Sequence, residues 1–203
     1  IDSPAETAGV LMAAGKWKEI DTAAISFGHG VSVSAIQLIS SVAAIANDGV
    51  LMRPRVVQAI TDRQGQVLQQ FDPEPIRQAV SRSTARTLKE ILRTVMLPGG
   101  TGTQAALDGY TACGKTGTAR KVDENGQYAN DRHVASFIGF APAEEPRIAV
   151  LVVIDEPKGQ IYGGAVAAPV FRKITQSTLN YLNVPPRPTT EKLRVARDDE
   201  GRG

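Results

Sequence analysis

Apolar residues recur at helical spacing in a segment that follows Ser34. They lie three or four positions apart, at Ile36, Ile39, Ala43 and Ala46. Ser34 and Gln37 match a capping box, in which each residue bonds the backbone of the other. Asn47-Asp-Gly49 is a turn signal at the far end. The pattern therefore predicts a helix between Ser34 and Asn47.

Two further helices are expected, one in the middle of the chain and one near its end. Ser83 is the expected cap of the first, and Pro98-Gly-Gly100 is its expected end. Its apolar face consists of Leu88, Ile91, Leu92 and Val95. The second is expected over residues 166–182. Residues 183–203 are rich in proline and charge, so we expect them to form a disordered tail.

Strand patterns occupy the remaining apolar segments. Residues 56–61 and 66–71 flank Asp62-Arg-Gln-Gly65, which is typical of a hairpin turn. Three more strands are expected over residues 110–121, 133–140 and 147–154, and the short turns between them favour antiparallel pairing. The sequence thus predicts an α+β fold, with an antiparallel sheet and flanking helices in one domain over residues 1–182.

Composition is that of an ordinary globular protein. A chain of 203 residues with 42% apolar content can bury one substantial core. A net charge of +2 and an aromatic content of 5% argue against a nucleic-acid partner. One cysteine and two histidines predict neither a disulfide nor a metal site. No apolar run approaches the roughly 18 residues of a membrane span. Because the chain opens on Ile1 rather than Met, we expect it to be part of a longer protein.

The run Gly114-Lys-Thr-Gly-Thr118 is compatible with two different chemistries. Together with Gly109 it matches the phosphate-loop pattern G-x-x-x-x-G-K-[ST], and the apolar run ending at Asp155 resembles a Walker B strand. Alternatively, Lys115-Thr-Gly-Thr118 is the K-T-G element of a penicillin-recognising acyl transferase. These alternatives imply a nucleotide hydrolase and a cell-wall enzyme, respectively.

The flanking residues distinguish the two alternatives. A phosphate loop follows a buried strand and opens a helix. Residues 99–108 form a glycine-rich stretch without an apolar strand, and residues 117–126 show no apolar stripe at helical spacing. The sequence therefore predicts a strand over residues 110–118. A helix that begins at Lys115 or Thr116 would contradict this prediction.

An ordered set of motifs resembles the end of the class B penicillin-binding proteins. The segments are Lys115-Thr-Gly-Thr118, Phe137-Ile-Gly-Phe-Ala-Pro142, Val152-Val-Ile-Asp-Glu-Pro157, Tyr162-Gly-Gly164 and Ala168-Pro-Val-Phe171. Phe27-Gly-His-Gly30 and residues 37–47 resemble the helical segment that precedes them in the family. The resemblance covers about residues 1–182. Within the family it is greatest to the cell-division-specific peptidoglycan D,D-transpeptidases of Gram-negative bacteria.

The resemblance implies a serine β-lactamase-like fold and an enzyme without a cofactor. Such enzymes crosslink D-Ala-D-Ala stem peptides by serine acyl transfer in septal cell-wall synthesis, and they bind β-lactams. The family uses three motifs, of which Ser-x-x-Lys and Ser-x-Asn occur nowhere in this chain. In the family both precede the segment that resembles Ile1-Asp2. We therefore expect the C-terminal part of a transpeptidase domain, unable to be acylated alone.

Residue roles also follow from the resemblance. Lys115 would project into the cleft, and the backbone N–H of Thr118 would be an oxyanion donor. Thr116 and Thr118 alternate along a strand, so both hydroxyls face one side and can bind a terminal carboxylate. Gly117 would let the substrate approach closely. Tyr162 and Gly163 are expected to border the cleft.

The expected partners are stem peptides, β-lactams, the N-terminal half of the same domain and other cell-division proteins. The expected location is the periplasmic face of the inner membrane, with the anchor outside this chain. A non-enzymatic penicillin-recognising sensor or scaffold stays open as an alternative, because it would share these residues.

Other reactive residues are expected to be structural. We expect His29 to pack at a turn, His133 to lie at the surface and Cys113 to be a small core residue. Asp155 and Glu156 are adjacent on a predicted strand, so we expect their side chains to point to opposite faces rather than form a catalytic dyad.

Overall fold

The computed structural model describes residues 7–26, 28, 30–122 and 127–187. Phe27, His29, the turn signal at 123–126 and the tail from residue 188 onward lie outside the described residues. In the part of the chain that is described, every helix is too short or too polar to span a bilayer.

A three-stranded antiparallel sheet forms the centre of the molecule. Its strands are β7 (Cys113–Val122), β8 (Tyr128–Ala141) and β9 (Ile148–Asp155), in the order β7-β8-β9. In the register of the sheet, Thr116 lies opposite Phe137. The predicted antiparallel strands are therefore confirmed. β7 begins later than expected, because residues 110–112 are irregular, and it continues through Lys115 and Thr116 without turning into a helix.

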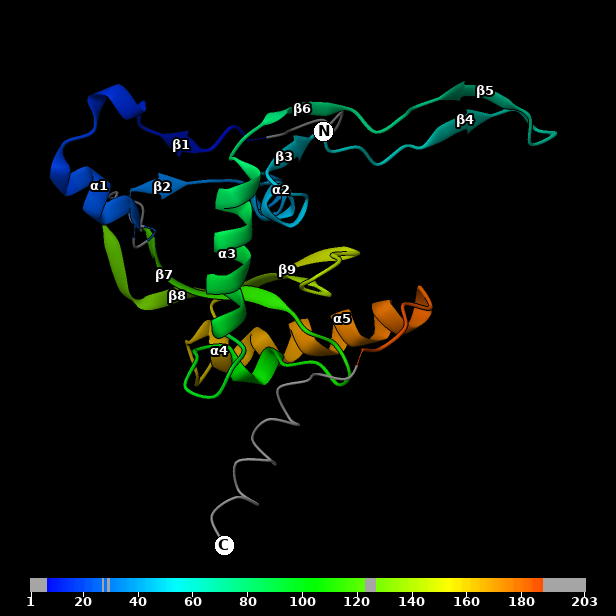
Figure 1. The fold of residues 1–203 in the computed structure, drawn as a ribbon. Coiled ribbons are helices and arrows are strands. Elements are labelled where there is room, and N and C mark those ends of the chain that lie inside the picture. The colour runs from blue at the N-terminus through cyan, green and yellow to red at the C-terminus, as the bar shows by residue number, and fades with distance from the viewer. Residues whose placement is uncertain (1–6, 27, 29, 123–126, 188–203) are drawn as a thin grey trace, which may run out of the picture.

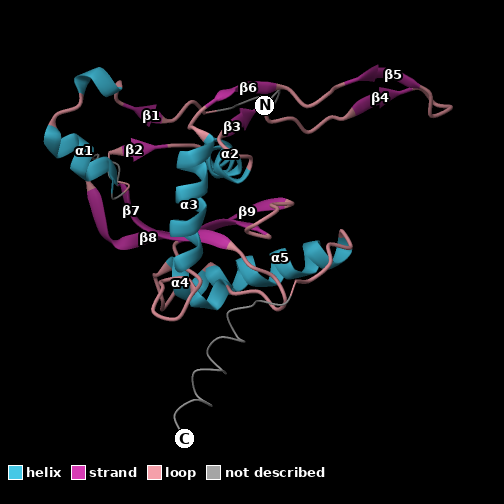
Figure 2. Cartoon of the chain, in the orientation of Figure 1, coloured by secondary structure: helices cyan, strands magenta, loops and turns pink. Residues whose placement is uncertain are grey.

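Helices cover both faces of this sheet, as the predicted α+β fold requires (Figures 1 and 2). On one face α5 (Ala168–Tyr181) follows the short α4 (Gly163–Val166). Phe171 of α5 packs against Phe137 of β8, with ring centroids 4.8 Å apart. On the other face lie α2 (Ala35–Ala46) and α3 (Arg82–Thr94), which enclose Cys113 and Phe140.

The predicted helix starts are partly right. Ser34 and Gln37 form the capping box of α2: Ser34 Oγ accepts from the Gln37 backbone N–H at 3.3 Å, and Gln37 Oε1 accepts from the Ser34 N–H at 2.9 Å. The cap of α3 is Ser81 rather than Ser83. Ser81 has an extended backbone and accepts from the Thr84 N–H at 3.1 Å, whereas Ser83 already lies in the first turn. The predicted helix over 166–182 is divided at Ala167, one residue after α4 ends.

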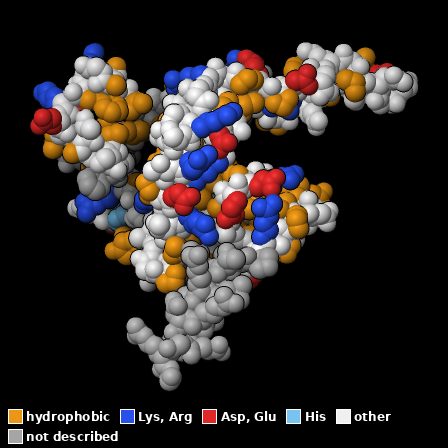
Figure 3. Space-filling model, viewed as in Figure 1, with side chains coloured by type: hydrophobic (Ala, Val, Ile, Leu, Met, Phe, Trp, Pro, Cys, Tyr) orange, Lys and Arg blue, Asp and Glu red, His pale blue; other side chains and the backbone are white. Residues whose placement is uncertain are grey.

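The side of α3 that faces the sheet is apolar and buried, whereas the side that faces solvent is charged. Ala85 is fully buried, and Leu92 packs against the core cluster of Cys113 and Phe140. The opposite side carries charged side chains, visible in Figure 3 as neighbouring blue and red groups. Amphipathic spacing of this kind fixes which face of a helix meets the sheet.

A narrow arm extends from the body (Figure 1). At its base β3 (Val50–Met52) pairs with β6 (Pro75–Gln78), and further out β4 (Ala59–Thr61) pairs with β5 (Val67–Gln70). Asp62 Oδ1 closes the outer turn by accepting from the backbone N–H groups of Gln64 and Gln66. The predicted hairpin is therefore confirmed, with strands shorter than expected.

Several short elements were not expected from the sequence. They are β1 (Val10–Leu11), the 3-10 helix η1 (Ala14–Lys16), α1 (Glu19–Ser26), β2 (Val31–Ser32) and the 3-10 helix η2 (Thr103–Ala105). None of them carries a periodic apolar pattern long enough to predict. The first residues of the predicted tail also pack in order, since Val184 O accepts from the Tyr110 hydroxyl at 2.7 Å and Arg187 N donates to Gly109 O.

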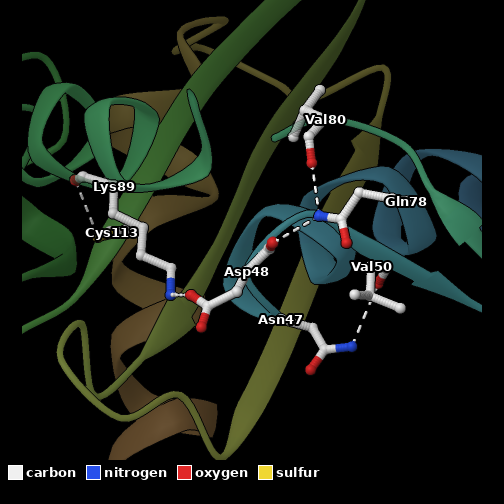
Figure 4. Close-up of polar contacts among 7 residues, drawn as sticks. All are labelled: Asn47, Asp48, Val50, Gln78, Val80, Lys89 and Cys113. Carbon is white, nitrogen blue, oxygen red and sulfur yellow. Dashed lines mark hydrogen bonds and ion pairs between the residues drawn. The ribbon is translucent and has the colours of Figure 1, made fainter. Parts of the chain in front are cut away.

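Asp48 joins the end of α2 to both α3 and the arm (Figure 4). Its side chain accepts from Lys89 Nζ at 2.8 Å, and its backbone oxygen accepts from Gln78 Nε2 at 2.9 Å. The carbonyl of Lys89 in turn accepts from the Cys113 thiol at 3.2 Å. This chain of contacts links the arm, through α3, to the start of β7.

We predict that Asp48→Asn lowers the stability of the full-length protein in a pH-dependent way. The hydrogen bond from Lys89 lowers the pKa of Asp48 below its ordinary value of 3.8, so the ionised carboxylate stabilises the fold. That stabilisation is present above about pH 4 and is lost as the pH falls through the lower pKa of the folded state. The loss at pH 7 should be roughly 0.2–1 kcal/mol, as for other exposed ion pairs.

Thermal melting of Asp48→Asn and of the wild type between pH 3 and pH 7 measures this difference. Asp72→Asn, a change in an exposed loop residue, is the matched control and should show no such trend. If the two melting temperatures differ by the same amount at both ends of the pH range, the ion pair does not act as described.

Candidate active site

A pocket of about 340 Å³ lies between β7, the turn before α4 and the loop that follows α3. Four of the predicted site residues, Thr116, Thr118, Tyr162 and Gly163, are in its wall. The remaining lining residues are Thr101, Thr103, Gln104, Gly164 and Ala165. The structure therefore brings together two segments that the sequence had placed at the cleft, and it adds a third.

The two threonines of β7 present their hydroxyls on the same side of the strand. Thr118 Oγ1 accepts from the backbone N–H of Gly163 at 3.2 Å. Thr116 Oγ1 lies 3.1 Å from Thr101 Oγ1, within hydrogen-bonding distance. Both hydroxyls are thus held by neighbours that belong to other segments of the pocket wall.

Lys115 and Gly117 alternate with these threonines along β7, so the Lys115 side chain and the Cα hydrogen of Gly117 that replaces a side chain lie on the opposite face of the strand. Neither lines the pocket. Lys115 is exposed, and its Nζ donates to the backbone oxygen of Thr116 at 2.9 Å. Its charge is therefore next to a residue of the pocket, although its side chain leaves the strand on the other side.

Glycines are required where the turn before α4 meets the sheet. A Cβ at Gly163 would overlap the backbone oxygens of Ser136 and Gly117, and a Cβ at Gly164 would overlap that of Thr101. The turn consequently lies directly against the backbone of the pocket wall. This close packing explains why Tyr162 is followed by two glycines.

Thr101, Thr103 and Gln104 were missed by sequence reasoning. They belong to the stretch Gly99-Gly-Thr-Gly-Thr-Gln104, whose pattern predicts only a glycine-rich loop. Gly102 is buried, and a Cβ there would lie 2.7 Å from the Phe137 ring. The signal that could have identified this loop is the placement of hydroxyl side chains between glycines, which is typical of a backbone packed close to a site.

Other residues considered from the sequence lie elsewhere. Cys113 is fully buried, and this burial raises the pKa of its thiol to about 12, so it is a core residue as expected. His133 lies within β8 and is partly buried, with Nδ1 enclosed and without a partner among the described residues. His133 is therefore half-buried at the surface rather than fully exposed. His29 lies outside the described residues.

The expectation for Asp155 and Glu156 is wrong in its geometry. β9 ends at Asp155, and Glu156 has a φ of 49°, so the alternation of a strand no longer applies to it. Both carboxylates contact Lys121 Nζ, at 3.0 and 2.9 Å. The hydrogen bonds to Glu156 and then Asp155 raise the pKa of Lys121. The pair is a structural ion cluster at the far end of β7.

The geometry excludes a phosphate loop at Gly109–Thr116, because β7 runs through Lys115 and Thr116 as an extended strand. No cluster of three or more His, Cys, Asp or Glu side chains that could hold a metal occurs within the described ranges. The pocket instead offers hydroxyl and backbone N–H donors, which suit an anionic or carbonyl oxygen.

Comparison with known proteins agrees with this geometry. The family model for the penicillin-binding protein transpeptidase domain matches residues 1–176. The probable peptidoglycan D,D-transpeptidase PenA of Neisseria gonorrhoeae is 43% identical over 184 residues, which are 90% of this chain and 30% of that protein. Peptidoglycan D,D-transpeptidase FtsI of Escherichia coli K12 is 37% identical over 182 residues, covering 89% of this chain and 29% of FtsI.

Solved structures show the same fold at substantial identity. The apo transpeptidase domain of Burkholderia pseudomallei penicillin-binding protein 3 has a TM-score of 0.79 and 39% identity, covering 93% of this chain and 54% of that one. Penicillin-binding protein 3 of Mycobacterium tuberculosis, solved with ampicillin, has a TM-score of 0.81 and 34% identity, covering 92% and 43%.

The chain spans about 30% of the length of the curated relatives that it matches and about half of the isolated transpeptidase domain. The family model matches residues 1–176 of this chain, and the fold agrees with those of the solved relatives. Together these two findings identify the family of the chain. This chain belongs to the penicillin-binding protein transpeptidase family, in its class B branch.

Proposed function

We propose that the protein containing this chain is a peptidoglycan D,D-transpeptidase, and that the chain is the C-terminal part of its catalytic domain. The observation that carries the proposal is the pocket in which the hydroxyls of Thr116 and Thr118 face the Tyr162-Gly-Gly164 turn. In a member of this family, such a wall suits the terminal carboxylate of a D-Ala-D-Ala stem peptide or of a β-lactam.

The proposed reaction is acyl transfer through a serine outside this chain. The serine oxygen attacks the carbonyl carbon of the penultimate D-Ala, and the peptide bond breaks to release the terminal D-Ala as the amine. The acyl group then passes to an amine of a second stem peptide, which restores the serine hydroxyl. Both Ser-x-x-Lys and Ser-x-Asn are absent from this sequence, which supports a nucleophile supplied by another segment of the full-length protein.

The residues of this chain would bind and polarise the substrate. Thr116 and Thr118 would donate to the carboxylate, and the Thr118 backbone N–H would be one oxyanion donor. Removing one such donor typically costs about 3–4 kcal/mol in the transition state. Lys115, whose ammonium lies beside the Thr116 carbonyl, would contribute positive potential for the anionic substrate. This chemistry requires no cofactor.

The setting of the reaction is inferred from the relatives. FtsI is named a peptidoglycan D,D-transpeptidase and PenA a probable one, and two Mycobacterium tuberculosis structures contain ampicillin or aztreonam. We therefore propose β-lactams as ligands and septal cell-wall synthesis, at the periplasmic face of the inner membrane, as the setting. The other half of the domain and further cell-division proteins would be the partners.

We predict that the full-length protein is labelled covalently by a fluorescent penicillin, whereas the isolated chain is not. The nucleophile lies outside this chain, so no acyl-enzyme can form on it. The measurement is fluorescence of the denatured protein on a gel, with heat-denatured full-length protein as the control. Labelling of the isolated chain that survives denaturation would show that a serine within it is the nucleophile.

Labelling alone does not distinguish an enzyme from a penicillin-recognising sensor. The sensor alternative predicts an acylated full-length protein that releases no D-Ala from a D-Ala-D-Ala pentapeptide. Release of D-Ala with transfer to an added amine supports the transpeptidase. Acylation without such turnover supports the sensor instead.

We predict that Thr118→Val slows acylation of the full-length protein by about one to two decades. Valine suits a strand and is nearly isosteric, but it also removes the oxygen that accepts from the Gly163 N–H, so a melting curve must separate a loss of stability from a loss of rate. The lost hydrogen bond to a charged group is worth about 1.5–3 kcal/mol. Lys115→Ala should also slow acylation, because it removes the positive charge that bonds the Thr116 carbonyl beside the pocket. The measurement is the second-order acylation rate with a β-lactam, together with a melting curve.

Thr61→Val is the matched control, since Thr61 is an exposed strand threonine in the arm. It should acylate at the wild-type rate. If Thr118→Val and Lys115→Ala also acylate at that rate while remaining folded, β7 does not line the site and the proposal fails.

A further inference from the structure

We propose that Thr101 is a positioning residue, which holds the hydroxyl of Thr116 so that its proton points toward the carboxylate of the substrate. The proposal rests on the function proposed above and adds a residue from outside the K-T-G-T strand. Its starting point is the 3.1 Å approach of Thr101 Oγ1 to Thr116 Oγ1 at the wall of the pocket.

The loop that carries Thr101 is held rigidly on both sides of that residue. The N–H of Gly100 donates to Leu97 O at 2.8 Å, and the N–H of Gly102 donates to Val95 O at 2.9 Å. Gly102 is buried against the Phe137 ring, and the backbone oxygen of Thr101 lies directly against Gly164. Because the backbone is fixed at these points, the Thr101 side chain has a defined position relative to β7.

A hydroxyl has one proton to donate and two lone pairs that accept. Thr118 shows how the pocket uses this: its oxygen accepts from the fixed N–H of Gly163, so its own proton is available for a ligand. When the Thr101 hydroxyl donates to Thr116 Oγ1, the proton of the Thr116 hydroxyl is likewise available for a ligand. Thr116 and Thr118 then each accept a hydrogen bond from another segment, and each hydroxyl proton points into the pocket.

Two hydroxyl protons on one face of a strand match the two oxygens of a carboxylate. Residues 116 and 118 are two positions apart, so their side chains lie on the same face of β7. Hydrogen bonds in a chain polarise one another, so a Thr101–Thr116–carboxylate chain binds an anion more strongly than a lone hydroxyl would. Thr101 therefore acts through Thr116 and selects for a charged carboxylate over a neutral group.

The test uses the full-length protein and a pair of β-lactams that differ only in the free carboxylate or its methyl ester. We expect Thr101→Val to lower the acylation rate with the carboxylate by about three- to tenfold, the range of one neutral hydrogen bond. The rate with the ester should change little. Thr101→Ser, which keeps the hydroxyl, should recover most of the loss.

A structural role for Thr101 would lower both rates together, and melting curves would show the instability. A double-mutant cycle with Thr116→Val separates direct from indirect action. If Thr101 acts through Thr116, adding Thr101→Val to the Thr116→Val protein lowers the carboxylate rate no further. Fully additive losses would show that Thr101 acts independently and would overturn the proposal.

The outcomes also separate this proposal from the proposed function. If the wild-type protein is not acylated by either β-lactam, the transpeptidase assignment fails. If the wild type is acylated and prefers the carboxylate, but Thr101→Val keeps both the rate and the preference, only the role of Thr101 is wrong. Thr61→Val again serves as the control for a threonine exposed on a distant strand.

Discussion

The buried ring of Phe137 is the contact on which the arrangement of the pocket depends. It packs against Phe171 of α5 on one side. Its edge lies so close to Gly114 and Gly102 that a Cβ at either residue would come within 2.7 Å of it. The same ring thus sets the position of β7 and that of the loop carrying Thr101. A larger residue at Gly102 or Gly114 would separate the two walls.

On the opposite face of the sheet, helices α2 and α3 pack against the start of β7. Cys113 packs with Phe140 beneath α2 and α3, and its thiol donates to the Lys89 carbonyl. Lys89 also pairs with Asp48 at the end of α2. The start of the K-T-G-T strand is therefore enclosed by two layers of helices, whereas the residues from Lys115 onward become accessible. A rigid start and an open continuation are what a binding strand requires, because the ligand must reach a backbone that does not move.

In the proposed function, the pocket selects for a negatively charged ligand by orienting neutral hydrogen-bond donors. Each β7 hydroxyl that faces it lies within hydrogen-bonding distance of a group from another segment, Gly163 or Thr101. Neutral donors of this kind cost little to desolvate compared with a buried cation. Lys115 adds its charge from outside, with its ammonium bonded to the Thr116 carbonyl. Lys115 therefore supplies positive charge, whereas Thr116 and Thr118 supply the placement of the hydrogen bonds. Substitutions of the lysine and of the threonines should affect ligand binding in different ways.

Local patterns in the sequence determined much of this fold, and packing between distant segments decided the rest. The capping box of Ser34 and the turn at Asp62 depend on neighbours within a few residues, so they could be predicted. The extended conformation of β7 could be predicted because the residues after Thr116 carry no helical apolar pattern. The contact of Thr101 with Thr116 spans fifteen positions and depends on Phe137, a further twenty-one residues along the chain. The joint approach of Asp155 and Glu156 to Lys121 depends on a left-handed residue beyond the strand end. The sequence alone indicated Thr116, Thr118, Tyr162 and Gly163 as candidate site residues. Only the tertiary structure decided that Thr101 joins them and which side chains meet, because side-chain orientation across the pocket follows from the packing of the core.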